Sequence, residues 1–177
     1  MNGKFLLYGT LAAGITLFVW QTISNVAIPW HAATVSAFTD NAGAVKAVQA
    51  IAPTNGVYAA PEGVLLVQSL TPDLADKTKS MGPNMAKQIV IDLIAAFILC
   101  IVVARIGVRR KRDTALTLAL AALAIVMIKE LSDWNWYGFA ATYEIVNIID
   151  LTISFAIAGA VIAWVYKKQV GGGAVPA

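Results

Sequence analysis

Four long apolar stretches divide this chain of 177 residues, and they restrict its fold more than any other feature of the sequence. They cover about residues 5–24, 87–108, 114–131 and 142–166. Each is close to the roughly 20 residues that an α-helix needs to cross a bilayer. Hydrophobic residues are 59% of the chain and charged residues 13%, whereas soluble domains have about 45–50% and about 25%. We therefore expect an all-α membrane protein with four transmembrane helices.

The first apolar stretch follows Lys4 and in that respect resembles a signal peptide. Its length, however, is that of a complete transmembrane span. A good cleavage site is also missing, because cleavage after Ala27 would place Asn25 at the −3 position. We therefore interpret residues 1–24 as an uncleaved first transmembrane helix.

A cluster of basic residues between the second and third stretches predicts the orientation of the chain. Residues 104–113 contain five Lys or Arg and a single acid, Asp113. Membrane proteins keep such residues preferentially on the cytoplasmic side. With Lys4 and the two lysines after the fourth stretch, the cluster forms a basic belt, so the net charge of +3 indicates topology and not nucleic-acid binding. The residues expected to set the topology and to contact lipid headgroups are Arg105, Arg109, Arg110, Lys111, Arg112, Lys167 and Lys168.

This orientation predicts a multi-pass membrane protein, with both termini in the cytoplasm and residues 25–86 outside it. We expect residues 25–86 to form a small α/β cap between the first two spans. Thr39 or Asp40 can cap a short helix over residues 41–51. Apolar runs over residues 57–60 and 64–70 predict a hairpin, and residues 71–83 a loop or short helix. Residues 169–177 are expected to be a flexible tail.

The fourth stretch carries a stripe of polar side chains. Glu144, Asn147, Asp150 and Ser154 fall within about 120° of one face of the helix. A charge in the middle of the bilayer costs at least about 2.5–3.5 kcal/mol, so this stripe should face other helices or water. The expected intramembrane polar cluster consists of Asp92, Lys129, Glu144, Asn147 and Asp150, with Glu130, Lys87 and His31 nearby.

Two interpretations of the polar cluster remain open. It could carry protons or hold a cation or a polar headgroup, or it could be a network that only joins the helices. We favour the network, because Glu144 and Lys129 are expected to be shallow enough to contact water. Asp150 lies about two turns deeper. We expect its carboxylate to face the bundle and to pair with a polar group on the second or third span.

Small residues recur at helical spacing on the third and fourth stretches and predict close helix packing. These residues are Ala115, Ala119, Ala122, Gly159 and Ala163. Residues 132–139 are expected to be an outer turn. Its aromatic residues, Trp134, Trp136, Tyr137 and Phe139, would form a belt at the membrane interface.

No motif in the sequence indicates a catalytic site, a metal site or a cofactor. Cys100 is the only cysteine and His31 the only histidine, which excludes a disulfide within the chain and paired-histidine haem ligation. His31 lies next to Trp30 at the end of the first span. We interpret it as a polar anchor, with a metal ligand, an axial cofactor ligand or a pH sensor as alternatives.

The order of features resembles a family of small bacterial inner-membrane proteins with four spans and no assigned activity. The resemblance rests on Gly9–Trp20, on the Pro-Trp-His step at 29–31, and on the segment from Gly56 to Pro61. It implies a shared fold and no reaction. We therefore expect a non-catalytic accessory or scaffolding subunit of a larger membrane complex, for instance in electron transport or photosynthesis. Its partners would be lipids and other membrane subunits. The alternative is a small transporter or proton-handling protein that uses the intramembrane carboxylates.

Overall fold

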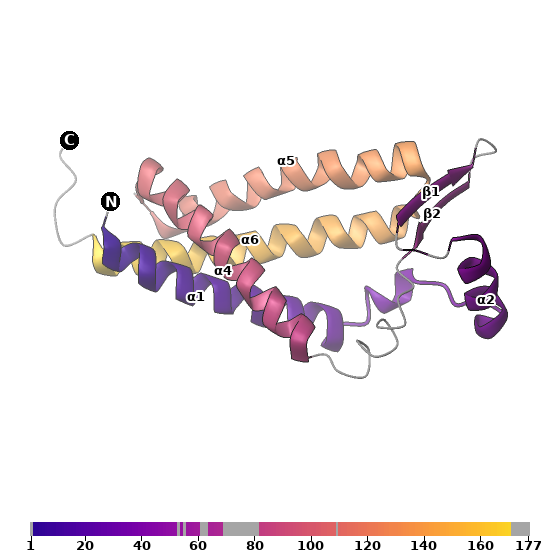
Figure 1. Ribbon diagram of the computed structural model, residues 1–177. Coiled ribbons are helices and arrows are strands. Elements are labelled where there is room, and N and C mark those ends of the chain that lie inside the picture. The colour runs from indigo at the N-terminus through magenta and orange to yellow at the C-terminus, as the bar shows by residue number, and fades with distance from the viewer. Residues whose placement is uncertain are drawn as a thin grey trace. The chain divides into compact units, whose positions relative to one another are not determined.

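The computed structural model describes residues 2–52, 54, 56–60, 64–68, 82–108 and 110–170. Most of these residues belong to four long helices, α1 (Gly3–Thr22), α4 (Gly82–Ile106), α5 (Lys111–Tyr137) and α6 (Ala141–Gln169) (Figure 1). A π-helical turn, Ile23–Ala27, extends α1. All four helices are long and apolar enough to cross a membrane, α1 together with this turn. The expected all-α class with four candidate transmembrane helices is confirmed.

The third long helix continues further than the sequence predicts. Residues 132–137, expected in an outer turn, are the last residues of α5. Lys129 pairs with Asp133 four residues later, which favours the helix at this point. The helix ends at Gly138, whose φ of 70° lies in the left-handed region, and the Gly138 N–H donates to the Asp133 carbonyl. The turn between α5 and α6 is therefore shorter than expected.

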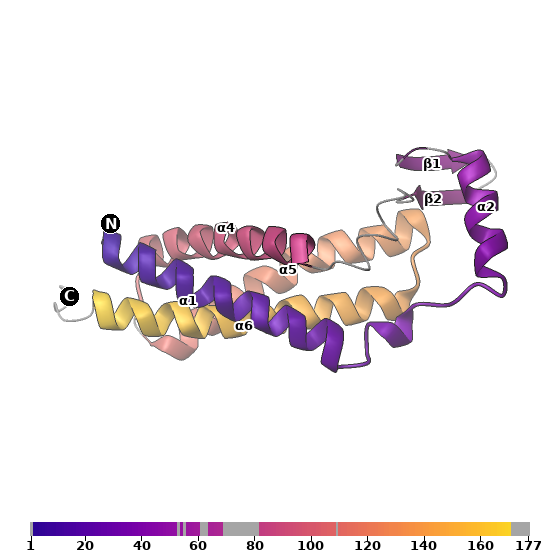
Figure 2. The ribbon, with the colours of Figure 1, turned by 60° about the horizontal axis from the view of Figure 1, so that its bottom comes forward.

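Small residues set the contacts between the long helices. The longest contact joins α5 and α6, and α1 packs along α6 (Figures 1 and 2). A Cβ atom at Gly159 of α6 would lie 3.0 Å from the Cα atom of Ala115 on α5. A Cβ at Gly14 of α1 would lie 3.1 Å from the Cα of Leu93 on α4. These positions allow the helix backbones to approach closely.

The beginning of α1 and the end of α6 lie at the same end of the bundle. The side-chain amide of Asn2, which also caps α1, donates to the carbonyl of Gln169 at 2.9 Å. An apolar core fills this half of the bundle, and its buried members include Phe5, Cys100, Val103, Leu118, Ala158, Ile162 and Val165. That both termini lie in the cytoplasm stays a prediction and is part of the functional proposal.

Residues Val35–Ala86 form a second compact unit. Within it, α2 (Asn41–Ile51) begins as predicted, since the Asp40 carboxylate accepts from the N–H of Gly43. The predicted hairpin is present as the antiparallel strands β1 (Gly56–Ala60) and β2 (Val64–Gln68), paired from Gly56 opposite Gln68 to Ala60 opposite Val64. The α/β cap expected over residues 25–86 is not supported, because the described residues of this unit supply only one short helix and an isolated two-stranded hairpin.

Residues 25–34 belong to the bundle rather than to the second unit. Trp30 hydrogen-bonds to Ser24 of the π-helical turn, and His31 to Asp150 of α6. These bonds explain why the boundary falls later than residue 25. Several predictions concern residues outside the described part of the chain. These are the connection at 61–63, the loop at 71–81, Arg109 and the tail at 171–177.

Candidate functional site

Most of the buried polar residues among those described gather in one half of the bundle, which we call the polar end. It comprises the last turns of α1 and α5, the first turns of α4 and α6, and the turns at residues 23–34. Because the helices alternate in direction, groups far apart in the sequence meet there. All four buried carboxylates among the described residues lie in this half, namely Asp92, Glu130, Glu144 and Asp150. They form three separate groups.

Asp150 is the centre of the first group. Its Oδ1 accepts a hydrogen bond from the indole N–H of Trp20 at 2.7 Å. Its Oδ2 lies 3.0 Å from Nε2 of His31, and this pair is partly shielded, with side-chain exposures of 8% and 18%. The ring of Trp30 packs edge-on against His31. Both oxygens of this deep carboxylate therefore have partners, one from α1 and one from the segment that follows it.

Ser24, His31 and Asp150 are the residue types of a hydrolase triad, but their arrangement differs from one. In a triad, histidine uses one ring nitrogen for the serine and the other for the carboxylate. Here Nε2 of His31 faces both Ser24 Oγ, at 3.3 Å, and Asp150. The Ser24 hydroxyl also accepts from the indole N–H of Trp30 at 3.1 Å. A nitrogen that is bonded to the carboxylate cannot also act as base toward the serine, so this group is a hydrogen-bond network.

Asp92 forms the second group with two glutamines. Its Oδ1 accepts from the side-chain amides of Gln21, at 3.2 Å, and Gln88, at 3.0 Å. Gln88 also donates to the side-chain oxygen of Gln21 at 3.0 Å. The other oxygen, Oδ2, is buried and has no hydrogen-bond partner among the described residues. This group joins α1 to α4, and its polar contacts stay on these two helices.

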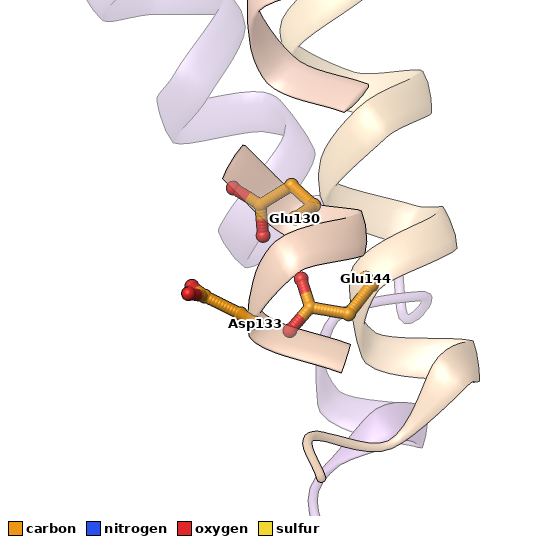
Figure 3. Close-up of side chains that lie close together, drawn as sticks. All are labelled: Glu130, Asp133 and Glu144. Carbon is orange, nitrogen blue, oxygen red and sulfur yellow. The ribbon is translucent and has the colours of Figure 1, made fainter. Parts of the chain in front are cut away.

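Three carboxylates form the third group, which joins α5 to α6 (Figure 3). Glu130, Asp133 and Glu144 each offer an oxygen, and these oxygens lie within 4.8 Å of one another. Lys129 Nζ is 2.9 Å from Glu130 and 3.0 Å from Asp133. The amide of Asn147 donates to the second oxygen of Glu130 at 3.2 Å. Glu144 is only 1% exposed, and neither of its oxygens has a hydrogen-bond partner among the described residues.

The structure corrects two expectations about the polar cluster. Asp150 faces the bundle as predicted, but its predicted partner on the second or third span is wrong, because Trp20 of α1 and His31 bind it. Glu144 was expected to be shallow enough to contact water, and it is buried instead because α5 covers it. Lys129 is exposed as expected. The predicted single cluster of Asp92, Glu144, Asn147, Asp150 and Lys129 is thus divided among three places.

Several residues of the polar end were missed from the sequence. They are Trp20, Gln21, Ser24, Gln88 and Asp133. A signal existed for two of them, since Gln88 and Asp133 stand four residues from Asp92 and Lys129 and therefore share a helix face with them. Trp20 offered none, because an interfacial tryptophan is ordinary in a transmembrane helix.

The residues predicted for helix packing lie at the α5–α6 contact. Ala122 and Ala163 are buried, and Ala115 and Ala119 are half-buried. Gly159 lies directly against Ala115 and Leu118.

The described residues of the basic belt lie at helix ends opposite the polar end. Arg105 and the pair Lys167 and Lys168 occupy the last turns of α4 and α6, where the helix dipole favours cations. Arg110, Lys111 and Arg112 occupy the start of α5, where the helix dipole disfavours cations. The helix dipole therefore does not explain their position. Lys168 also lies 4.0 Å above the Trp164 ring.

No protein-family model, curated protein or solved structure matches this chain. The geometry of the polar end is therefore the basis for a functional proposal.

Proposed function

We propose that this protein is a non-catalytic accessory or scaffolding subunit of a larger complex in the bacterial inner membrane. Both termini would lie in the cytoplasm, so that the polar end and residues 25–86 face the opposite side. The subunit would dock through the outer faces of its helices and through the segment at residues 25–86. Lipids and other membrane subunits are its partners in this proposal.

The one-sided distribution of the buried carboxylates carries the proposal. The buried carboxylates among the described residues all lie at the polar end. The other half is closed by apolar side chains, among them Phe5, Val103, Leu118 and Ile162. Moving an ion or proton across a bilayer needs polar groups through its whole depth. A bundle whose described buried carboxylates all lie at one end is better suited to binding than to conduction.

The uncovered faces of the helices also support a docking role. On α4, Ile91, Ile94 and Ile98 are each more than half exposed and share one face of the helix. On the opposite side of α4, Leu93 packs against Gly14 of α1 and Cys100 against Gly9. The helix is therefore held by one face and offers the other to lipid or to a partner.

Gentle solubilisation of native membranes tests the proposal. The tagged full-length chain should migrate in native electrophoresis together with other membrane proteins, well above its own 18.7 kDa and its detergent. Replacing Ile91, Ile94 and Ile98 together by Ala should release those partners. The comparison variant, Ile125→Ala with Ile128→Ala on the exposed face of α5, shows whether release depends on the α4 face or on exposed apolar surface in general. Migration as a lone monomer would contradict the proposal.

A second candidate function is a small transporter or proton-handling protein, and the burial of Glu144 favours it. We favoured a purely structural network because Glu144 was expected to contact water. Glu144 is buried instead, so this argument against proton handling does not hold. The test is an ion or proton flux into proteoliposomes that contain the purified protein. A flux abolished by Asp150→Asn or Glu144→Gln, and unchanged by Asp113→Asn at the other end of α5, would favour transport.

A further inference from the structure

Glu144 is a buried carboxylate for which the described part of the fold supplies no hydrogen-bond donor. Its residue exposure is 1%, and both oxygens lack a partner. The donors nearby are committed elsewhere, since Lys129 bonds to Glu130 and Asp133 and the Asn147 amide bonds to Glu130. Burial of a carboxylate without compensation is costly. The position therefore needs a compensating positive charge, which either a bound cation or a proton can supply.

The charge of the cluster indicates how much compensation is missing. Glu130, Asp133 and Glu144 carry three formal negative charges, and Lys129 offsets one of them. Two negative charges remain, which a single divalent cation would balance. Figure 3 shows the Glu144 side chain of α6 extending toward α5, where Glu130 and Asp133 lie on neighbouring turns.

We propose that Glu130, Asp133 and Glu144 bind one divalent cation of the calcium type. Carboxylates are hard oxygen ligands, which suit Ca²⁺, Mg²⁺ and Mn²⁺ rather than softer metals. Ca²⁺ binds oxygen at about 2.3–2.6 Å, so two oxygens on one ion lie at most about 5 Å apart. The cluster offers one oxygen from each residue within 4.8 Å of the others, which satisfies this limit. Three carboxylates can supply up to six oxygens, and water completes the shell.

Lys129 is the competing cation of this site. Its ammonium group lies between Glu130 and Asp133, while 65% of its side chain is exposed. The long flexible side chain can therefore move into water when the metal binds. The Asp133 side chain is 25% exposed, so the site opens toward the aqueous side of the polar end. This inference is independent of the proposed docking role, because it concerns binding by the isolated chain.

Equilibrium binding of radioactive Ca²⁺ to the chelator-treated full-length protein in detergent tests the site. The wild type should bind one Ca²⁺ saturably. Glu144→Gln keeps the size and removes the charge, and it should weaken binding at least tenfold while the protein stays folded. Lys129→Gln removes the competing ammonium and should tighten binding severalfold. Asp150→Asn and Asp113→Asn remove the same charge elsewhere in the bundle and should change the affinity less than twofold.

The opposite results overturn the proposal. No saturable binding by the wild type would mean that Glu144 is neutralised by a proton, which it would share with Glu130, and not by a metal. Equal binding by the wild type and Glu144→Gln would place the ion elsewhere. Weaker binding by Lys129→Gln would contradict the role of Lys129 as a competitor. Thermal unfolding of each variant in Ca²⁺ and in chelator shows, independently, whether the ion binds the folded state.

Discussion

His31 and Asp150 are 119 residues apart in the chain, yet Nε2 of His31 lies 3.0 Å from Oδ2 of Asp150. The pair joins the segment after α1 to the third turn of α6. Trp20 binds the other oxygen of the same carboxylate and adds α1 to the contact. A single buried carboxylate thus holds three parts of the bundle together at the polar end.

The His31–Asp150 pair should be measurable as a coupling energy. In a cycle of His31→Ala, Asp150→Ala and the double variant, unfolding in mixed micelles should give a coupling of about 0.6–1.7 kcal/mol, as for polar contacts between transmembrane helices. His31→Ala with Asp113→Ala, an exposed acid at the other end of the bundle, should give none. Additive effects of His31→Ala and Asp150→Ala would show that the contact does not stabilise the fold.

Gly159 should tolerate no side chain that branches at Cβ. A Cβ there would lie 3.0 Å from the Ala115 Cα and 3.1 Å from the Leu118 side chain, so α5 and α6 would have to separate. Gly159→Val should lower the free energy of unfolding by about 1–3 kcal/mol. The matched change Gly82→Val, at a position with nothing within 4 Å, should stay within about 0.5 kcal/mol. Similar losses at both positions would contradict close packing at Gly159.

Gly138 should be sensitive to substitution for a different reason. Nothing lies within 4 Å of a Cβ placed there, but its φ of 70° is unfavourable for residues with a side chain. Gly138→Ala should cost about 1–2 kcal/mol in thermal or denaturant unfolding. Gly138→Asn should cost less, because Asn adopts this conformation more readily. An equal loss for Ala and Asn would point to a cause other than backbone strain.

The two ends of α5 should lie on opposite sides of the membrane. Its 27 residues span about 40 Å, which exceeds the roughly 30 Å of the hydrocarbon core. In intact cells, an impermeant maleimide should label Trp136→Cys and should label Lys111→Cys only after permeabilisation. The native Cys100 is buried and should give no background. The reverse pattern would invert the proposed orientation.

Much of the helical framework could be predicted from the sequence because bilayer thickness and hydrophobicity act on local stretches. Apolar runs of about 20 residues indicated four helices, and a capping residue at Thr39 or Asp40 indicated the start of α2. The C-terminal end of α5 was missed because Ser132 and Asp133 are residue types common in turns. The helix continues through them and ends before Gly138. The depth of Glu144 was missed because distance from a helix end does not show what a neighbouring helix covers.

The sequence by itself determined the class of protein, the number of apolar helices and the separation of basic from acidic residues. These properties follow from local composition and from the membrane as solvent. Only the tertiary structure decided which polar residues meet. Asp150 binds Trp20 and His31, whereas Glu144 lies with Glu130 and Asp133, although Glu144 and Asp150 share one helix. The physical reason is that the partner of a buried charge depends on which helix packs against it.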